Sequence, residues 1–190
     1  MTIPKNCKVE LSASADVKTR KSICEPYLDL ETNEAGVPVR GQLIATDGRI
    51  MAVVPITPND HDVSGYVSEE VLKASRNVAS GKYVSVVCNG TAQIADNHSM
   101  PRAGLAEGTY PNWRQVLPAK VEAAAEAPTT HCIVALDIAL LWKLAQSLGT
   151  EGLRLQIPVD GMGCIRVDAC LCKGQYPTGA YGAIMPMRLS

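Results

Sequence analysis

The sequence predicts an α+β fold of repeated βαβββ units, in which helices lie on one face of curved antiparallel sheets. Two stretches carry the same order of expected elements, namely strand, helix, strand, turn, strand and strand: residues 66–118 and residues 131–189. The residues before 66 supply the strands of the same unit with a weaker helix pattern, so the chain holds two and a half to three copies. Such units bury their apolar faces by packing against their neighbours.

The composition is that of a globular protein without a strong charge. Of the 190 residues, 46% are hydrophobic and 19% are charged, and the net charge of −1 gives no overall basic field that would indicate nucleic acid. The seven Cys lack the spacing of a zinc site. Because the sequence shows neither a signal peptide nor an apolar run of about 18 residues, we expect a cytoplasmic protein with reduced thiols.

The first third of the chain predicts four strands. They are expected at Cys7–Leu11, Tyr27–Glu31, Val39–Ile44 and Arg49–Ile56. The last two are joined at Thr46-Asp47-Gly48, which indicates a hairpin because Gly accepts a positive φ. Residues 14–23 fit either a short helix or a solvated, charged loop.

The middle of the chain predicts a helix and a second hairpin. Ser68 is the expected N-cap of the helix, and two acidic residues follow it in the first turn. The hairpin joins Lys82–Cys88 to Thr91–Ala95 through Asn89-Gly90, a type I′ signal. Residues 119–130 are rich in Ala and Glu and lie between prolines, which predicts a linker.

The C-terminal part has the clearest helix. Asp137 is its expected cap, Gly149 ends it, and an apolar stripe runs along one side: Leu136, Leu140, Leu141, Leu144 and Leu148. Three strands follow, at Leu153–Ile157, Cys164–Cys170 and Ala180–Leu189. Residues 182–190 are apolar, whereas chain ends are usually polar. We expect this segment either to pack as a last strand or to serve a partner, since Met side chains repack easily.

Three stretches, in this order, resemble the bacterial sliding clamp, the β subunit of the replicative DNA polymerase. Residues 45–53, ATDGRIMAV, resemble the family's ATDGHRLAV. Residues 110–118, YPNWRQVLP, are similar to its FPDYRRVLP, and residues 185–189 match its C-terminal MPMRL. The order and the rough fit of the separations make the joint match specific. The resemblance implies a DNA-clamp-like fold.

The resemblance covers only part of the family's chain, which has three domains of two βαβββ units each. Residues 1–118 resemble the middle domain, residues 119–130 form the expected linker, and residues 131–190 resemble the closing half of the last domain. The first domain has no counterpart. We interpret the chain as a compact relative, such as a phage or mobile element would encode.

The resemblance implies a hydrophobic pocket that takes short linear motifs from a DNA polymerase and other proteins. An apolar cleft with Met walls suits a short peptide with Leu or Phe anchors. Two positions depart from the family's pattern: Arg49-Ile50 replaces a His-Arg pair, and Gln115 replaces an Arg at the rim. The matching positions are Leu28, Thr46, Gly48, Arg49, Met51, Pro111, Val116, Ile184, Met185, Pro186, Met187 and Arg188.

The resemblance also implies a ring around double-stranded DNA. The family lines the hole with helices whose basic side chains contact phosphates without reading sequence. The candidates here are Lys73, Arg76, Lys82 and Lys143, with weaker ones at Lys18, Arg20 and Lys21. The family's ring holds twelve units, so a chain of three units would close it as a homo-tetramer, whereas a chain of two and a half units would form no ring.

Three hypotheses remain open from the sequence. The chain is a processivity clamp on DNA, or it is a clamp mimic or scaffold that captures the same motifs without a ring, or it is a small enzyme of unrelated fold. His61, His98 and His131 fit no nucleophile or metal pattern, and no Gly-rich phosphate loop is present. We therefore expect no catalytic residue, no metal, no cofactor and no membrane contact.

Overall fold

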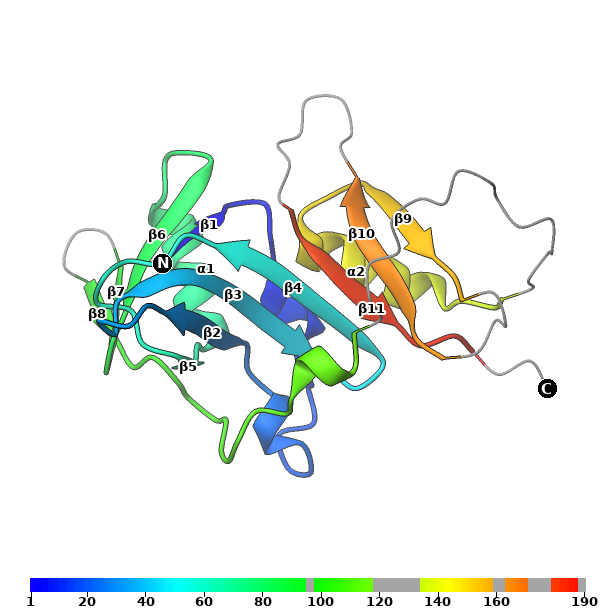
Figure 1. Ribbon diagram of the computed structural model, residues 1–190, viewed down its shortest axis with the longest axis horizontal. Coiled ribbons are helices and arrows are strands. Elements are labelled where there is room, and N and C mark those ends of the chain that lie inside the picture. Colours follow the sequence, from blue (N-terminus) through cyan, green and yellow to red (C-terminus); the bar gives the residue numbers. More distant parts are fainter. Residues whose placement is uncertain (95–97, 118–133, 159–162, 171–178, 188–190) are drawn as a thin grey trace.

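The computed structural model describes residues 1–94, 98–117, 134–158, 163–170 and 179–187. Within these residues the strands form two antiparallel sheets (Figure 1). The larger sheet has, in spatial order, β5 (Gly65–Tyr66), β2 (Tyr27–Thr32), β3 (Pro38–Thr46), β4 (Ile50–Ile56), β11 (Tyr181–Ile184), β10 (Ile165–Cys170) and β9 (Gly152–Gln156). The smaller has β1 (Thr2–Pro4), β6 (Tyr83–Cys88), β7 (Ala92–Ile94) and β8 (His98–Met100).

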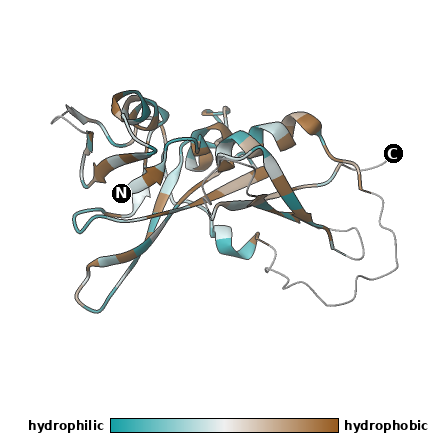
Figure 2. Cartoon of the chain, turned by 90° about the horizontal axis from the view of Figure 1, so that it is seen from above, coloured by the Kyte–Doolittle hydropathy of each residue, from teal (hydrophilic) through white to brown (hydrophobic). Residues whose placement is uncertain are grey.

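The two α-helices lie on one face of the sheets, and the short helix at Trp113–Gln115 lies on the opposite face, as Figures 1 and 2 show. The described helices are η1 (Val9–Ser12), η2 (Lys21–Ile23), α1 (Glu69–Val78), η4 (Trp113–Gln115) and α2 (Ile138–Leu148), where η marks a 3-10 helix. Helix α1 packs on β6 and β7, whereas α2 packs on η1, β4 and β11. Apart from η2 and η4, the elements read in chain order β1-η1-β2-β3-β4, then β5-α1-β6-β7-β8, then α2-β9-β10-β11. The predicted α+β class with repeated units is confirmed.

Local capping explains where both α-helices begin and where α2 ends. The Ser68 hydroxyl accepts a hydrogen bond from the Val71 N–H at 3.3 Å, and Asp137 accepts one from the Ala139 N–H at 2.8 Å. Gly149 ends α2 with φ of 68°, and a Cβ there would lie 2.9 Å from the backbone nitrogen of Cys7. Glycine is therefore required both for the left-handed cap and for the close approach of the N-terminal segment.

The pairing of β4 with β11 joins the two parts of the chain in one sheet. Val53 lies opposite Tyr181, and Ile50 lies opposite Ile184. The ladder continues past β11, because the Met185 N–H donates to the Arg49 carbonyl at 2.9 Å. The last predicted strand is thus internal, between β4 and β10, and ends at Ile184.

Strand β4 is buried on both faces, which explains its unbroken apolar sequence. Ile50, Ala52 and Val54 face the main core, together with Leu144 and Leu148 of α2. The alternate residues belong to a second cluster on the opposite face: Met51 and Val53, with Ile44, Tyr110, Trp113 and Ala183. This alternation is the period of two of a β-strand.

Two local predictions were wrong. Cys7–Leu11 is not a strand, because η1 turns there so that Val9 and Cys7 are both buried and the Lys8 N–H donates to the Gln146 carbonyl at 3.2 Å. The β6–β7 hairpin forms, but Gly90 does not have a positive φ. The Asn89 carboxamide oxygen instead accepts from the Thr91 N–H at 3.1 Å. The Asn89-Gly90 pair therefore predicted the position of the turn correctly but not its type.

The remaining predictions have mixed outcomes. The β3–β4 hairpin, α1 and α2 are confirmed. Residues 14–23 form a loop that ends in η2. The expected linker at 119–130 lies outside the described residues. The division into domains at 1–118 and 131–190 stays a prediction.

Gly182 gives a test of the β4–β11 pairing. A Cβ at this position would overlap the carbonyl oxygen of Met51 and lie 3.2 Å from Leu144 Cδ1, so Gly182→Ala forces the two strands apart. We expect the free energy of unfolding to fall by about 1–3 kcal/mol, measured by urea titration with circular dichroism. The control is Gly81→Ala, because a Cβ there meets nothing within 4 Å. Equal stability of the two variants would contradict the observed pairing.

Candidate functional site

A pocket of about 230 Å³ opens beside the β3–β4 turn, where three segments distant in the sequence meet. Seven of the residues matched to the family's pocket line it: Thr46, Gly48, Arg49, Met51, Pro111, Val116 and Met185. Six others complete the lining: Ile23, Ile50, Tyr110, Trp113, Cys164 and Ala183. The pocket is thus built mainly from the β3–β4 turn, the segment around η4 and the end of β11, with Ile23 of η2 and Cys164 before β10 beside them.

The β3–β4 turn is held by its own side chains. The Thr46 hydroxyl donates to the Ile50 carbonyl at 2.7 Å and accepts from the Gly48 N–H at 3.1 Å. Asp47 Oδ1 accepts from the backbone N–H groups of Arg49 at 2.9 Å and Ile50 at 3.0 Å. Gly48 has φ of 88°, which suits glycine. These bonds hold Gly48 and Arg49 at the exposed edge of the pocket.

Asp47 also ties the turn to α2. Its Oδ2 lies 3.0 Å from Lys143 Nζ. Burial alone would raise the pKa of Asp47, but the N–H groups of Ile50 and Arg49 and the Lys143 ammonium outweigh it, so this pKa lies below its usual value. Asp47 therefore stays charged at neutral pH, and its charge is compensated within the fold.

The second wall is an aromatic segment anchored on β2. The Trp113 indole N–H donates to Asp29 Oδ2 at 2.9 Å, and Arg114 lies 2.6 Å from the same oxygen. The Arg114 guanidinium also covers the Trp113 ring, 4.5 Å from its centroid. Tyr110 stacks on Tyr27 with ring centroids 5.0 Å apart. Trp113 and Tyr110 are therefore held in place by contacts within the chain.

The third wall comes from β11 and the residue before β10. Met185 is 46% exposed and is the movable part of the wall. The Cys164 thiol lies 3.7 Å from the Ile184 carbonyl, and burial raises its pKa. At neutral pH this thiol is protonated and behaves as a small apolar group. The floor of the pocket is accordingly apolar.

Five matched positions do not line this pocket. Leu28 and Ile184 are fully buried in the main core, because they point to the opposite face of the sheet. Met187 is 55% exposed and pairs with Ala135 in an isolated bridge beyond the pocket, and Pro186 lies between Met187 and Met185. Arg188 lies outside the described residues.

Most of the predicted DNA-facing cations are already paired. Lys73 is exposed and bridges Glu69 one turn away, and Lys143 is bound to Asp47. The prediction for Arg76 is corrected, because its side chain is 11% exposed and is paired with buried Glu10, so it does not face solvent. Lys82 is exposed just before β6. Of the weaker candidates, Lys21 pairs with Glu107 at 2.7 Å, while Lys18 and Arg20 are exposed.

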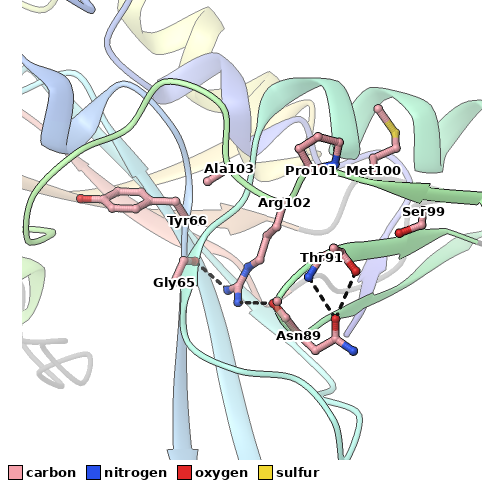
Figure 3. Close-up of a pocket in the computed structure, with 10 residues that line it drawn as sticks. Gly65, Tyr66, Asn89, Thr91, Ser99, Met100, Pro101, Arg102 and Ala103 are labelled. Carbon is pink, nitrogen blue, oxygen red and sulfur yellow. Dashed lines mark hydrogen bonds between the residues drawn. The ribbon is translucent and has the colours of Figure 1, made fainter.

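A second, open cavity of about 720 Å³ lies between β5 and the β6–β7 turn (Figure 3). Arg102 is 9% exposed there and donates to the carbonyls of Gly65 at 2.9 Å and Asn89 at 3.3 Å. Burial lowers the pKa of Arg102. Because its guanidinium holds one backbone carbonyl on each side, Arg102 ties the smaller sheet to the edge of the larger one.

Comparison with solved structures places this fold among the bacterial sliding clamps. The DNA polymerase III β subunit of Thermotoga maritima, the Pseudomonas aeruginosa sliding clamp bound to griselimycin and the Bacillus subtilis sliding clamp align with TM-scores of 0.66, 0.64 and 0.63. Each is 13% identical and matches 100% of this chain. The chain spans 65%, 65% and 64% of their lengths, respectively. No protein-family model and no curated protein sequence matches it.

At this identity the likeness shows the fold, which is that of a sliding clamp. This fold contradicts the hypothesis of a small enzyme of unrelated fold. Within the described residues, no group of three His, Cys, Asp or Glu side chains is arranged to hold a metal ion. In the same part of the chain, no helix has the length and apolar character needed to span a membrane.

Tyr110 gives a test of the aromatic wall. It is 8% exposed, and its hydroxyl oxygen has no hydrogen-bond partner among the described residues. A buried polar group without a partner costs stability, so Tyr110→Phe is expected to raise the free energy of unfolding by about 1 kcal/mol. Thermal and urea unfolding measure this change.

The matched control is Tyr66→Phe in the same aromatic cluster. The Tyr66 hydroxyl lies 3.1 Å from the carbonyls of both Ser22 and Gly108. Its removal is expected to lower stability by about 1 kcal/mol. If both variants lost stability equally, the Tyr110 hydroxyl would have a hydrogen-bond partner in solution, which would contradict the structure.

Proposed function

We propose that the chain is a sliding-clamp-like replication processivity factor. In this proposal it holds short apolar segments of a DNA polymerase or other partner proteins in the pocket, and it encircles double-stranded DNA as a homo-oligomer. The observation that carries the proposal is the pocket itself. Three separate segments that resemble sliding-clamp sequences meet at one apolar cavity in a sliding-clamp fold.

The chemistry of the cavity supports a peptide ligand. Its floor is apolar, the Trp113 ring is fixed by Asp29, and exposed Met185 can adapt to the shape of an apolar side chain. A pocket of about 230 Å³ accommodates one or two side chains and not a whole domain. That a sliding clamp of similar fold has been solved with bound griselimycin also supports ligand capture by this fold.

The order of elements supports the ring. The described part of the chain contains three consecutive groups of one helix and its strands, with η1 in the place of the first helix. Four such chains would supply the twelve units of a clamp ring. Closure would use the edge strands of the described sheets, such as β9 and β5 in the larger sheet.

A second candidate function is that of a clamp mimic or scaffold that captures the same segments without a ring. The pairing of the predicted cations favours it, because Lys73, Arg76 and Lys143 each face a carboxylate of this chain. Paired cations contribute less to phosphate binding than unpaired ones. Mass and peptide binding separate the two candidates.

The first test is truncation of the movable pocket wall. Met185→Ala should weaken binding of a fluorescent hexapeptide with two Leu and one Phe by about tenfold or more, as measured by fluorescence anisotropy. The control is Val63→Ala, since Val63 is 56% exposed and does not line the pocket. Unchanged affinity in Met185→Ala would remove the pocket assignment.

The second test is the absolute mass in solution, by light scattering behind size exclusion. A ring predicts a closed assembly near four times 20.2 kDa, which should also remain on circular DNA and leave it after linearisation. A monomer or dimer that still binds the hexapeptide would contradict the ring and support the scaffold.

A further inference from the structure

The open cavity between β5 and the β6–β7 turn is separate from the pocket beside the β3–β4 turn. The two cavities share no lining residue, and the open cavity is larger, at about 720 Å³ against about 230 Å³. Among its lining residues, all in the described part of the chain, Arg102 carries the only charge. Figure 3 shows its guanidinium between Gly65 on one side and Asn89 on the other. The structure therefore places one buried cation beside a space that can hold a whole small molecule.

The charge of Arg102 has no close counter-charge within the described residues. No carboxylate oxygen in that part of the chain lies within 4.0 Å of its guanidinium nitrogens. Asp62 acts on Arg102 at longer range. Its carboxylate is already engaged by the Met1 amine and by the Cys88 N–H, the latter at 2.7 Å. A buried charge without a partner is costly, so an anion in this cavity would stabilise the folded state.

Arg102 also has hydrogen-bonding capacity that the chain does not use. A guanidinium has five N–H groups, and two of them donate to the carbonyls of Gly65 at 2.9 Å and Asn89 at 3.3 Å. The Arg102 Nε is buried and has no hydrogen-bond partner among the described residues. Gly65 has φ of 148°, and a Cβ there would lie 3.3 Å from Nη2 and 3.5 Å from Nη1. A side chain at position 65 would cover the guanidinium, whereas glycine leaves it open.

The other walls of the cavity supply neutral donors and an apolar side. Thr91 and Ser99 line it across from Gly65, as Figure 3 shows, and both residues are exposed. Each carries a hydroxyl group, which can donate a hydrogen bond to an anion. Met100 and Pro101 line the side next to Arg102. The lining thus combines one cation, two hydroxyl groups and an apolar side.

We propose that the open cavity binds a small organic phosphate. The phosphate group accepts hydrogen bonds from the Arg102 guanidinium and from the hydroxyl groups of Thr91 and Ser99. The organic part lies along Met100 and Pro101. Because the donors come from three separate side chains, they suit the three acceptor oxygens of a phosphate better than the two oxygens of a carboxylate. This site is independent of the proposed capture of partner segments, since the two cavities share no lining residue.

Phenyl phosphate is the probe that tests the proposal, and benzyl alcohol is its uncharged counterpart. In an NMR titration of the full chain labelled with nitrogen-15, phenyl phosphate should give saturable shifts at the amides of Gly90, Ser99 and Arg102. Benzyl alcohol should bind at least about tenfold more weakly, because hydrogen bonds to a charged group are the stronger ones. Shifts centred on the Trp113 indole would place the probe in the other pocket and overturn the proposal.

Two further probes define the chemistry of the ligand. Benzoate keeps the ring and carries a carboxylate, whereas inorganic phosphate lacks the ring. Each should bind about threefold or more weakly than phenyl phosphate, because one loses an acceptor oxygen and the other loses the apolar contact. Tighter binding of benzoate would overturn the choice of a phosphate, and equal binding of inorganic phosphate would overturn the role of the apolar side.

Variants of the cavity complete the experiment. Arg102→Gln should abolish the binding of phenyl phosphate. Thr91→Val with Ser99→Ala should weaken it about threefold to tenfold, and this double variant keeps the test valid if the two sheets separate in Arg102→Gln. The matched control is Thr32→Val with Ser85→Ala, which should bind as the unaltered protein does. Both control residues are exposed on strands and do not line the cavity.

The outcomes bear on this site and leave the proposed function untouched. Equal binding of phenyl phosphate and benzyl alcohol, or binding of neither, would show that Arg102 does not attract an anion. Unchanged affinity in the double variant would remove the two hydroxyl groups from the site. Saturable binding by a folded Arg102→Gln protein would remove the guanidinium. Capture of the hexapeptide is measured at the other pocket, so its success or failure is a separate result.

Discussion

The antiparallel pairing of β4 with β11 is the constraint on which the rest of the structure depends. It merges strands from the first third and from the C-terminal part of the chain into one sheet. The absence of a side chain at Gly182 lets the two backbones approach. The Met185 N–H donates to the Arg49 carbonyl and so extends the ladder beyond β11. This hydrogen bond fixes Met185, on one wall of the pocket, opposite the β3–β4 turn. A shift by one residue would turn Ile184 out of the core and Ala183 into it.

Side-chain contacts fix helix α2 to the segment around η1 and to the β3–β4 turn. The Ser147 and Ser12 hydroxyls are 2.7 Å apart, the Cys7 thiol donates to the Leu148 carbonyl at 3.4 Å, and Lys143 binds Asp47. The first two contacts involve residues next to or within η1, which occupies the place of a helix in the first unit. A short 3-10 turn is sufficient there because α2 covers the same part of the core.

Elements with local signals were predictable from the sequence, and those that depend on distant partners were not. Ser68, Asp137 and Gly149 act within their own helices. Five alternating residues at Cys7–Leu11 did not distinguish a strand from a 3-10 turn packed on α2. Residues of the β3–β4 turn were found through their motif, but Cys164 and Ile23 reach the pocket only through tertiary packing. The alternating pattern of β2 does not show which of its faces meets the pocket, so it could not show that Leu28 lies in the main core. The pattern of α1 likewise does not show that Arg76 pairs with Glu10 of η1.

The pairing of β4 with β11 also sets the order of events in folding. All the elements from β5 to β10 lie between these two strands in the chain. Their contact is therefore non-local, and such contacts form slowly because a long loop must close first. The β3–β4 hairpin can form early, but the cavity beside it has no third wall until β11 has inserted. The proposed binding of a partner segment at this cavity would therefore require β11 to be in place.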